Sequence, residues 1–134
     1  MSEVKIDLIF VRKTVSVLGA LIDILDWDIA LARIKNWGNN RDSRYVCLCN
    51  VHSIMTAGSD IEFYDVIQNA DMATADGAPV AWLMRKLGYT QQQRINGPDL
   101  LWKYCIEANK SADWPSIYLY GAAEETLRLL QLRL

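Results

Sequence analysis

An Asp-Gly pair in the segment ATADGAPVAW puts a carboxylate at the joint between a short apolar run and a predicted helix. Asp76 is followed by Gly77, and a carboxylate that ends a strand beside a flexible glycine is exposed to a cleft. There it can take a proton from a hydroxyl nucleophile and act as a general base. An aspartate in front of a helix more often caps the helix N-terminus. The two roles are compatible, and the spacing leaves both open.

Arg94, in the loop QQQRINGPD, is a candidate for binding phosphate. It precedes Gly97 and Pro98, where a helix is predicted to begin because the missing N–H of proline costs nothing at the first helical position. An arginine beside exposed helix N–H groups suits a phosphate, although a solvated loop arginine is the commoner case. Asp99 is most simply a cap residue that the helix dipole favours.

Two polar residues, Asn50 and His52, follow the apolar segment YVCLC. Asn50 could donate to a sugar hydroxyl, or it could satisfy a turn. His52 is the only histidine of the chain. A lone histidine is more often a structural or surface residue than a catalyst, so both interpretations stay open here.

Gly121, in YLYGAAEE, resembles the turn of a nucleotide-binding α/β unit. The second and third glycines of G-x-G-x-x-G are missing, so the dinucleotide fingerprint is very weak. An acidic ribose-binding residue is also missing from the expected context, which disfavours an NAD-dependent oxidoreductase. The sequence contains no Walker A motif.

The elements that must position these residues alternate between apolar strands and helices. The run RYVCLCNV shows no alternation of polar residues, which predicts a strand buried on both faces, and SIYLY predicts another buried strand. Asp26 or Asp28 suits a helix N-cap, and GNN predicts the end of that helix. Strands are predicted within 15–25 (two, bent at 19–20), 44–51, 71–75 and 116–120, and helices over 27–37, 60–70, 78–88, 98–110 and 122–134.

This order predicts an α/β class, with a mostly parallel sheet and flanking helices in a single domain over residues 1–134. Residues 1–13 are expected to form a loose N-terminal segment. Ligands of such sheets bind beyond the carboxyl ends of the strands. Residues 50–53, 76–77 and 121 should therefore meet at one edge. The final helix stops in mid-pattern, so we expect the sheet to be incomplete at its C-terminal end.

Composition narrows the functional class. The chain has 134 residues, 51% hydrophobic and 22% charged, with a net charge of −2. This composition is typical of a globular protein. The slightly negative net charge argues against a broad nucleic-acid-binding surface, which needs clustered Lys and Arg.

No apolar run is long enough to span a membrane and no signal peptide is present, so the expected compartment is the cytoplasm. The cysteines make no metal or disulfide pattern. Residues expected to serve mainly in packing are Cys47, Cys49, Cys105, Trp82, Leu83 and Trp102.

From about residue 15 to the end, four motifs resemble those of the WecB/TagA/CpsF glycosyltransferase family. They are CNVHSIMTA, ADMATADGAPVAW, QRINGPDL and IYLYGAAEE, in the family's order and at its separations. Each motif alone is modest, but the four in sequence are specific. The resemblance implies a three-layer, Rossmann-like fold. It also implies an inverting transferase that moves a sugar from a UDP-sugar to a lipid-linked saccharide without a required metal or other cofactor.

The resemblance implies a role for individual residues. Asp76 falls on the family's proposed catalytic base, and Arg94 on an arginine near the donor or acceptor phosphates. Asn50 falls on the asparagine of a T-x-N pattern whose threonine is replaced by Leu48. The residues expected to bind substrate are Asn50, His52, Gly77, Arg94, Asn96, Gly97, Asp99 and Gly121.

The implied partners are a UDP-sugar and a polyprenyl-diphosphate-linked saccharide, met in peripheral contact with the inner face of the cytoplasmic membrane. Products of the family feed teichoic acid, enterobacterial common antigen or exopolysaccharide. Family members continue beyond residue 134 with further strand–helix units. The alternative is therefore an inactive fragment that binds nucleotide-sugar or associates with a partner. An open sheet edge predicts self-association.

Overall fold

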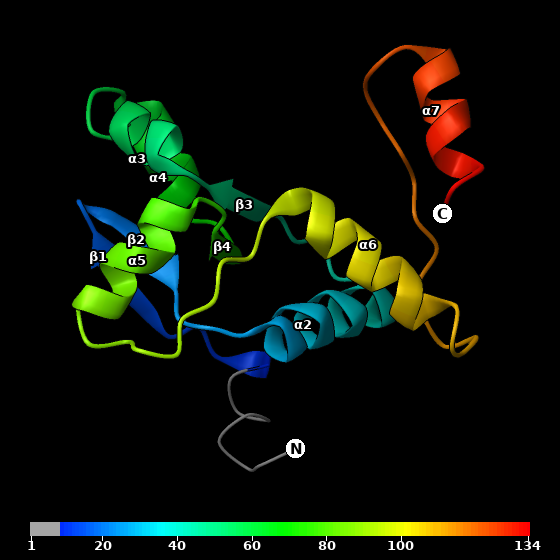
Figure 1. The fold of residues 1–134 in the computed structure, drawn as a ribbon, viewed down its shortest axis with the longest axis horizontal. Helices are drawn as coiled ribbons and strands as arrows, with labels where there is room; N and C mark the ends of the chain where they lie inside the picture. Colours follow the sequence, from blue (N-terminus) through cyan, green and yellow to red (C-terminus); the bar gives the residue numbers. More distant parts are fainter. Residues whose placement is uncertain (1–8) are drawn as a thin grey trace.

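The computed structural model describes residues 9–134, in which short strands alternate with helices (Figure 1). Within these residues, no helix combines the length and the apolar character needed to cross a bilayer. The elements are β1 (Thr14–Val17), β2 (Ala20–Asp23), α2 (Trp27–Asn40), β3 (Val46–Cys49), α3 (Val51–Ala57), α4 (Ile61–Gln68), β4 (Met72–Ala75), α5 (Ala78–Lys86), α6 (Gly97–Ala108) and α7 (Glu124–Gln131).

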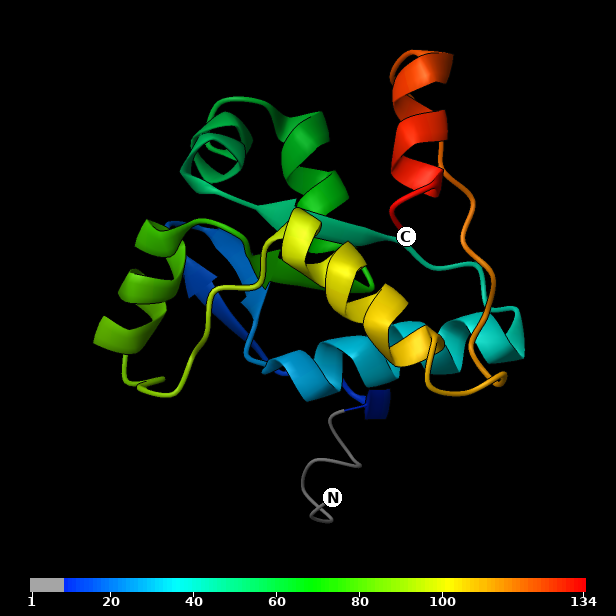
Figure 2. The same ribbon diagram turned by 45° about the vertical axis from the view of Figure 1, so that its right-hand side comes forward.

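The centre of the fold is the parallel pair β3–β4, which has helices on both faces. Val46 pairs with Met72 and Cys49 with Ala75. Met72 packs with side chains of α2 and α6, whereas Ala73 packs on the opposite face with side chains of α3, α4 and α5. Figures 1 and 2 show the same two helical layers. The predicted α/β class is thus confirmed, but the described residues form two two-stranded sheets and not a full Rossmann-like sheet.

The two strands predicted within residues 15–25 are present as β1 and β2, and they pair as an antiparallel hairpin. Its turn consists of Leu18 and Gly19, which have φ angles of +51° and +95°. Positive φ at both central residues is the requirement of a type I′ turn, one of the two turn types that match the twist of the strands. Glycine adopts this conformation without the steric cost that a Cβ imposes.

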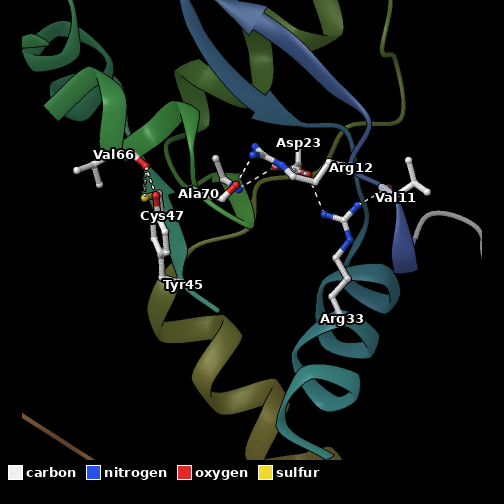
Figure 3. Close-up of polar contacts among 9 residues, drawn as sticks. Val11, Arg12, Asp23, Arg33, Tyr45, Cys47, Val66 and Ala70 are labelled. Atoms are coloured by element: carbon white, nitrogen blue, oxygen red, sulfur yellow. Dashed lines mark hydrogen bonds and ion pairs between the residues drawn. The ribbon is translucent and has the colours of Figure 1, made fainter. Parts of the chain in front are cut away.

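Asp23, at the end of β2, ties the hairpin to the rest of the core (Figure 3). Its fully buried carboxylate lies 2.8 Å from the Nη2 of Arg12 and 2.8 Å from the Nη1 of Arg33. It also accepts a 2.8 Å hydrogen bond from the main-chain N–H of Ala73 in β4. Arg12 in turn donates to the carbonyl of Ala70. A buried carboxylate is tolerated here because charged and polar donors surround it.

Helix α2 begins where predicted and ends later than predicted. Asp26 is its N-cap and accepts a 3.0 Å hydrogen bond from the N–H of Ile29. The helix continues through Gly38 to Asn40 instead of stopping at the glycine. A Cβ on Gly38 would lie 2.4 Å from the Cγ of Pro115. This glycine therefore permits a close approach between segments and does not end the helix.

The predicted buried strand over residues 116–120 is wrong. The segment is an extended loop outside both sheets, with Tyr118 87% and Tyr120 93% exposed. A buried strand needs a neighbouring strand for its backbone groups and a covering layer for its side chains, and the described residues supply neither. The helix that follows, α7, is present but has no buried residue. Figure 1 shows it standing apart from the β3–β4 pair.

Two further expectations about burial are wrong. β3 is not fully buried, because its residue Leu48 is 37% exposed. Trp82 and Trp102 are each 51% exposed, so they lie mainly on the outer sides of their helices. Leu83 does pack against the core, as expected. Of the predicted loose segment over residues 1–13, residues 1–8 lie outside the described part of the chain.

Candidate functional site at the carboxyl ends of β3 and β4

The ends of β3 and β4 lie directly against one another. The N–H of Asp76 donates a 3.0 Å hydrogen bond to the carbonyl of Cys49, which extends the parallel pairing one residue beyond β4. A Cβ on Gly77 would lie 3.5 Å from the Cα of Asn50, an ordinary van der Waals contact. Two of the three joints predicted to share an edge of the sheet therefore meet.

Asp76 does not cap helix α5. The N-cap residue is Gly77, and no side chain accepts a hydrogen bond from the first turn of the helix. The Asp76 side chain is 23% exposed, and no hydrogen bond to its carboxylate is present within residues 9–134. The capping interpretation is thus wrong for this aspartate. A partly exposed carboxylate that is not engaged in structure can exchange protons with a bound molecule.

Arg94 lies beside Asp76 and contacts it in two ways. Its Nε donates a 2.5 Å hydrogen bond to the main-chain carbonyl of Asp76. Its Nη2 lies 3.9 Å from the Oδ1 of the Asp76 carboxylate, at the limit of an ion pair. The Arg94 side chain is 53% exposed, so part of the guanidinium faces solvent. A cation and a carboxylate from different loops are therefore adjacent at this edge.

The loop that carries Arg94 runs along β4 like a short extra strand. The N–H of Ile95 donates to the carbonyl of Ala75 at 2.9 Å, and the Oγ1 of Thr74 donates to the carbonyl of Ile95 at 2.8 Å. Thr74 is fully buried within an otherwise apolar strand. This contribution of Thr74 was missed at the sequence level, although a lone polar residue in MATA is a usable signal for it.

Asn50 serves as the N-cap of α3, a helix that the sequence pattern did not predict. Its Oδ1 accepts hydrogen bonds from the N–H and the Oγ of Ser53, at 2.9 and 3.2 Å. The turn role of Asn50 is therefore present, and its amide Nδ2 donates to no other described residue. His52 lies in the first turn of α3 and is exposed. Among the described residues, no hydrogen bond or ion pair joins the side chain of His52 to that of Asp76.

Asn96, Gly97 and Asp99 form the start of α6, next to the same edge. The N-cap is Asn96 and not Asp99. The Oδ1 of Asn96 accepts from the N–H of Asp99 at 2.9 Å, and its Nδ2 donates to the Asp99 carboxylate at 2.7 Å. A Cβ on Gly97 would lie 2.7 Å from a methyl carbon of Leu48. Gly97 thus lets the helix start close to β3.

Gly121 does not join these residues. It has a φ of +106° and belongs to the extended segment that precedes α7. A cavity of 810 Å³ near this segment lies between α6 and α7, and Asp76 and Arg94 are not among its lining residues. The convergence expected for the third joint fails because residues 116–120 do not pair with β3.

Cys49, the last residue of β3, is unsuited to nucleophilic chemistry although it adjoins the site. It is 1% exposed. Burial, together with smaller contributions from the nearby Cys47 and Asp76, raises the pKa of its thiol from 9.0 to about 12. The thiolate is the reactive form of cysteine, so Cys49 is inert at neutral pH. Packing accounts for this residue, as the sequence indicates.

The chain matches a family of known proteins. The family described as "Glycosyl transferase WecG/TagA/CpsF family" matches residues 15–134. No protein of curated function matches the chain in sequence. The matched range covers every residue placed at the β3–β4 edge, including Asn50, Asp76, Arg94 and Asn96. It agrees with the family that the four sequence motifs indicated.

Proposed function

Because the chain belongs to the WecG/TagA/CpsF glycosyltransferase family, which works in cell-surface polysaccharide synthesis, we propose that it transfers a sugar from a UDP-sugar to a lipid-linked saccharide with inversion at the anomeric carbon. One observation carries the assignment of the site: the carboxylate of Asp76 and the guanidinium of Arg94 are adjacent at the carboxyl ends of two parallel strands. This is the edge at which α/β sheets bind their ligands.

Asp76 is the general base of the proposed reaction. Its carboxylate takes the proton of an acceptor hydroxyl while the hydroxyl oxygen attacks the anomeric carbon. The bond from that carbon to the phosphate oxygen breaks, and UDP leaves with the electron pair. A single displacement inverts the configuration, and no covalent intermediate is needed. The partial exposure of Asp76 and the lack of a capping role support this assignment.

Arg94 is the proposed contact for the diphosphate of the donor. Its Nε is already used on the carbonyl of Asp76, which leaves the two Nη groups for phosphate oxygens. Arginine suits this task because its planar fork donates two parallel hydrogen bonds. The positive charge would also stabilise the negative charge that develops on the leaving diphosphate. The N-termini of α5 and α6 lie near this edge and add favourable dipoles.

The remaining residues would shape the pocket. Asn50 has an amide group available for a sugar hydroxyl, and His52 and Gly77 lie within three residues of the same strand ends. Asn96, Gly97 and Asp99 hold the start of α6 in place beside them. Gly121 would contact the nucleotide only if its segment moved onto β3.

We propose that residues 116–120 move onto the free edge of β3. There they would pair with β3 and extend the parallel pair toward a three-layer, Rossmann-like sheet. The exposed side chains of Tyr118 and Tyr120 and the 37% exposure of Leu48 support this, because pairing would bury apolar surface on both segments. The same free edge could pair with a second copy of the chain, which would be seen as a dimer in sedimentation. The proposed reaction takes place on the cytoplasmic face of the membrane that holds the lipid-linked acceptor, and membership of the family supports this location.

The test is a transfer assay with UDP-N-acetylmannosamine and a polyprenyl-diphosphate-linked saccharide, in which the anomeric configuration of the product is read by NMR. The proposal predicts an inverted product and its loss in Asp76→Asn. A product of retained configuration would contradict the single displacement. UDP binding without any transfer would favour the alternative, a nucleotide-sugar-binding module without catalytic activity.

A further inference from the structure

Gln92 is a buried amide whose hydrogen bonds join two distant parts of the chain. Its Oε1 accepts from the N–H of Leu25 at 3.2 Å, and its Nε2 donates to the carbonyl of the same residue at 3.0 Å. The Nε2 also donates to the carbonyl of Gln93 at 2.8 Å. The residue is only 5% exposed. Its side chain therefore meets a backbone donor and two backbone acceptors, which only an uncharged amide can satisfy together.

The anchor point of Gln92 is itself fixed. Leu25 lies between β2 and α2 and is 5% exposed in the core cluster that also contains Ile29 and Met72. The main chain of Gln92 is held separately, because Arg85 of α5 donates from Nη1 to its carbonyl at 3.0 Å. Both the side chain and the backbone of Gln92 are thus tied to elements that belong to the core.

Arg94 follows Gln92 by two residues and directly precedes Ile95. Both backbone groups of Ile95 are hydrogen-bonded to β4: its N–H donates to the carbonyl of Ala75, and its carbonyl accepts from the Oγ1 of Thr74. The Arg94 side chain is 53% exposed, and its polar contacts within the described residues are those with Asp76, which the side chain can reach only from a backbone in the right place. Its position beside Asp76 therefore depends on where the backbone from Gln92 to Ile95 is fixed.

We propose that Gln92 is a positioning residue, which holds the Arg94 guanidinium against Asp76 by docking its loop to Leu25. The inference rests on the proposed function of Arg94 for its kinetic consequence, but its structural part can be tested independently. Preorganised charges act on a transition state only when they are already in place. A displacement of about 1 Å by a residue away from the chemistry can cost about 100-fold in rate.

The chain provides matched controls, because Gln92 is the middle one of three consecutive glutamines. Gln91 and Gln93 are exposed, and only the Gln93 carbonyl takes part in the contact. Replacing each glutamine in turn by methionine, which has a similar length but no amide, makes the same chemical change at one buried and two exposed positions. Gln92→Asn is a milder variant that keeps the amide but shortens its reach.

The first readout is NMR of the folded protein. In the wild type we expect a protected Nε–H signal of Arg94 and slow exchange of the Ile95 amide. In Gln92→Met both should be lost, while the amides of the β3–β4 ladder stay protected. Gln91→Met and Gln93→Met should retain both. If Gln92→Met does not fold, Gln92→Asn is judged by the same two signals.

The second readout is the kinetics of transfer. Gln92→Met should lower kcat by about 100-fold with a smaller change in KM for the acceptor, and the two control variants should match the wild type. A folded Gln92→Met or Gln92→Asn that keeps the Arg94 signal and its turnover would overturn the proposal. If the wild type neither binds UDP nor transfers sugar, the proposed function fails, and the NMR result still decides whether Gln92 fixes Arg94.

Discussion

The Nε of Arg94 donates its 2.5 Å hydrogen bond to the main-chain carbonyl of Asp76, while the carboxylate of the same residue lies 3.9 Å from Nη2. The arginine is thus anchored on the backbone of the strand end and does not form a tight ion pair with the carboxylate. A tight pair would occupy the carboxylate oxygens of Asp76 and the Nη groups of Arg94. The observed arrangement leaves the carboxylate oxygens and the Nη groups available for a ligand, which is what separate roles for a base and a phosphate contact require.

Replacement of Asp76 by asparagine should abolish sugar transfer and leave the fold intact. The amide cannot accept the proton of the acceptor hydroxyl. The side chain makes no capping bond whose loss would unfold α5. The measurement is initial transfer rate together with a thermal melt. Retained turnover in a folded Asp76→Asn protein would remove this residue as the base.

Lysine should not substitute for Arg94. Lys carries the same charge, but it has no Nε anchor for the Asp76 carbonyl and no planar fork for a diphosphate. We expect Arg94→Lys to weaken UDP binding by about 10-fold or more, since a hydrogen bond to a charged group contributes about 1.5–3 kcal/mol. Calorimetric titration with UDP measures this. An affinity equal to that of the wild type would show that charge alone suffices.

We expect the buried Asp23 to contribute more to the free energy of unfolding than an exposed, ion-paired aspartate does. Asp23→Asn leaves the side chains of Arg12 and Arg33 without the carboxylate that both contact. Breaking a buried ion pair on one side costs about 3–5 kcal/mol, to be measured by urea denaturation. Asp113→Asn removes an exposed partner of Lys35 and is the control. Its denaturation midpoint should scarcely change, and equal losses in the two variants would contradict the assignment.

Cys49 should make stability fall in alkaline solution. Its folded pKa of about 12 lies above the unfolded value of 9.0, chiefly because the thiol is buried. The stabilising contribution is therefore fully present below pH 9 and is lost as the pH rises from 9 to about 12. The loss amounts to about 1.4 kcal/mol per pH unit. Urea denaturation at several alkaline pH values should show a shallower fall for Cys49→Ala, and identical slopes would contradict the assignment.

The sequence predicts those elements that depend on residues close along the chain, and those that follow from general rules of sheet topology. The hairpin turn at Gly19, the Asp26 cap and the apolar strand MATA are all present, because a local pattern determines each of them. The meeting of Asn50 with Gly77 was also predictable, since consecutive parallel strands end at one edge.

The remaining features depend on contacts that a local pattern does not encode. Gly38 is a residue type that often marks the end of a helix, but here it makes room for Pro115, which is 77 positions away. The segment SIYLY has the composition of a buried strand, yet no strand in the described residues pairs with it. Gln92 cannot be told from its two neighbours by sequence. Only the position of Leu25 distinguishes it.

Titration of the purified chain with UDP, in parallel with Arg94→Ala, tests the central claim that Asp76 and Arg94 mark a nucleotide-sugar site. Arg133→Ala, which removes an exposed arginine of the C-terminal segment, is the control for net charge. We predict saturable binding to the wild type and to Arg133→Ala, and an affinity lower by about 10- to 100-fold for Arg94→Ala. Equal affinity in all three proteins, or no binding to a cooperatively folded wild type, would contradict the claim.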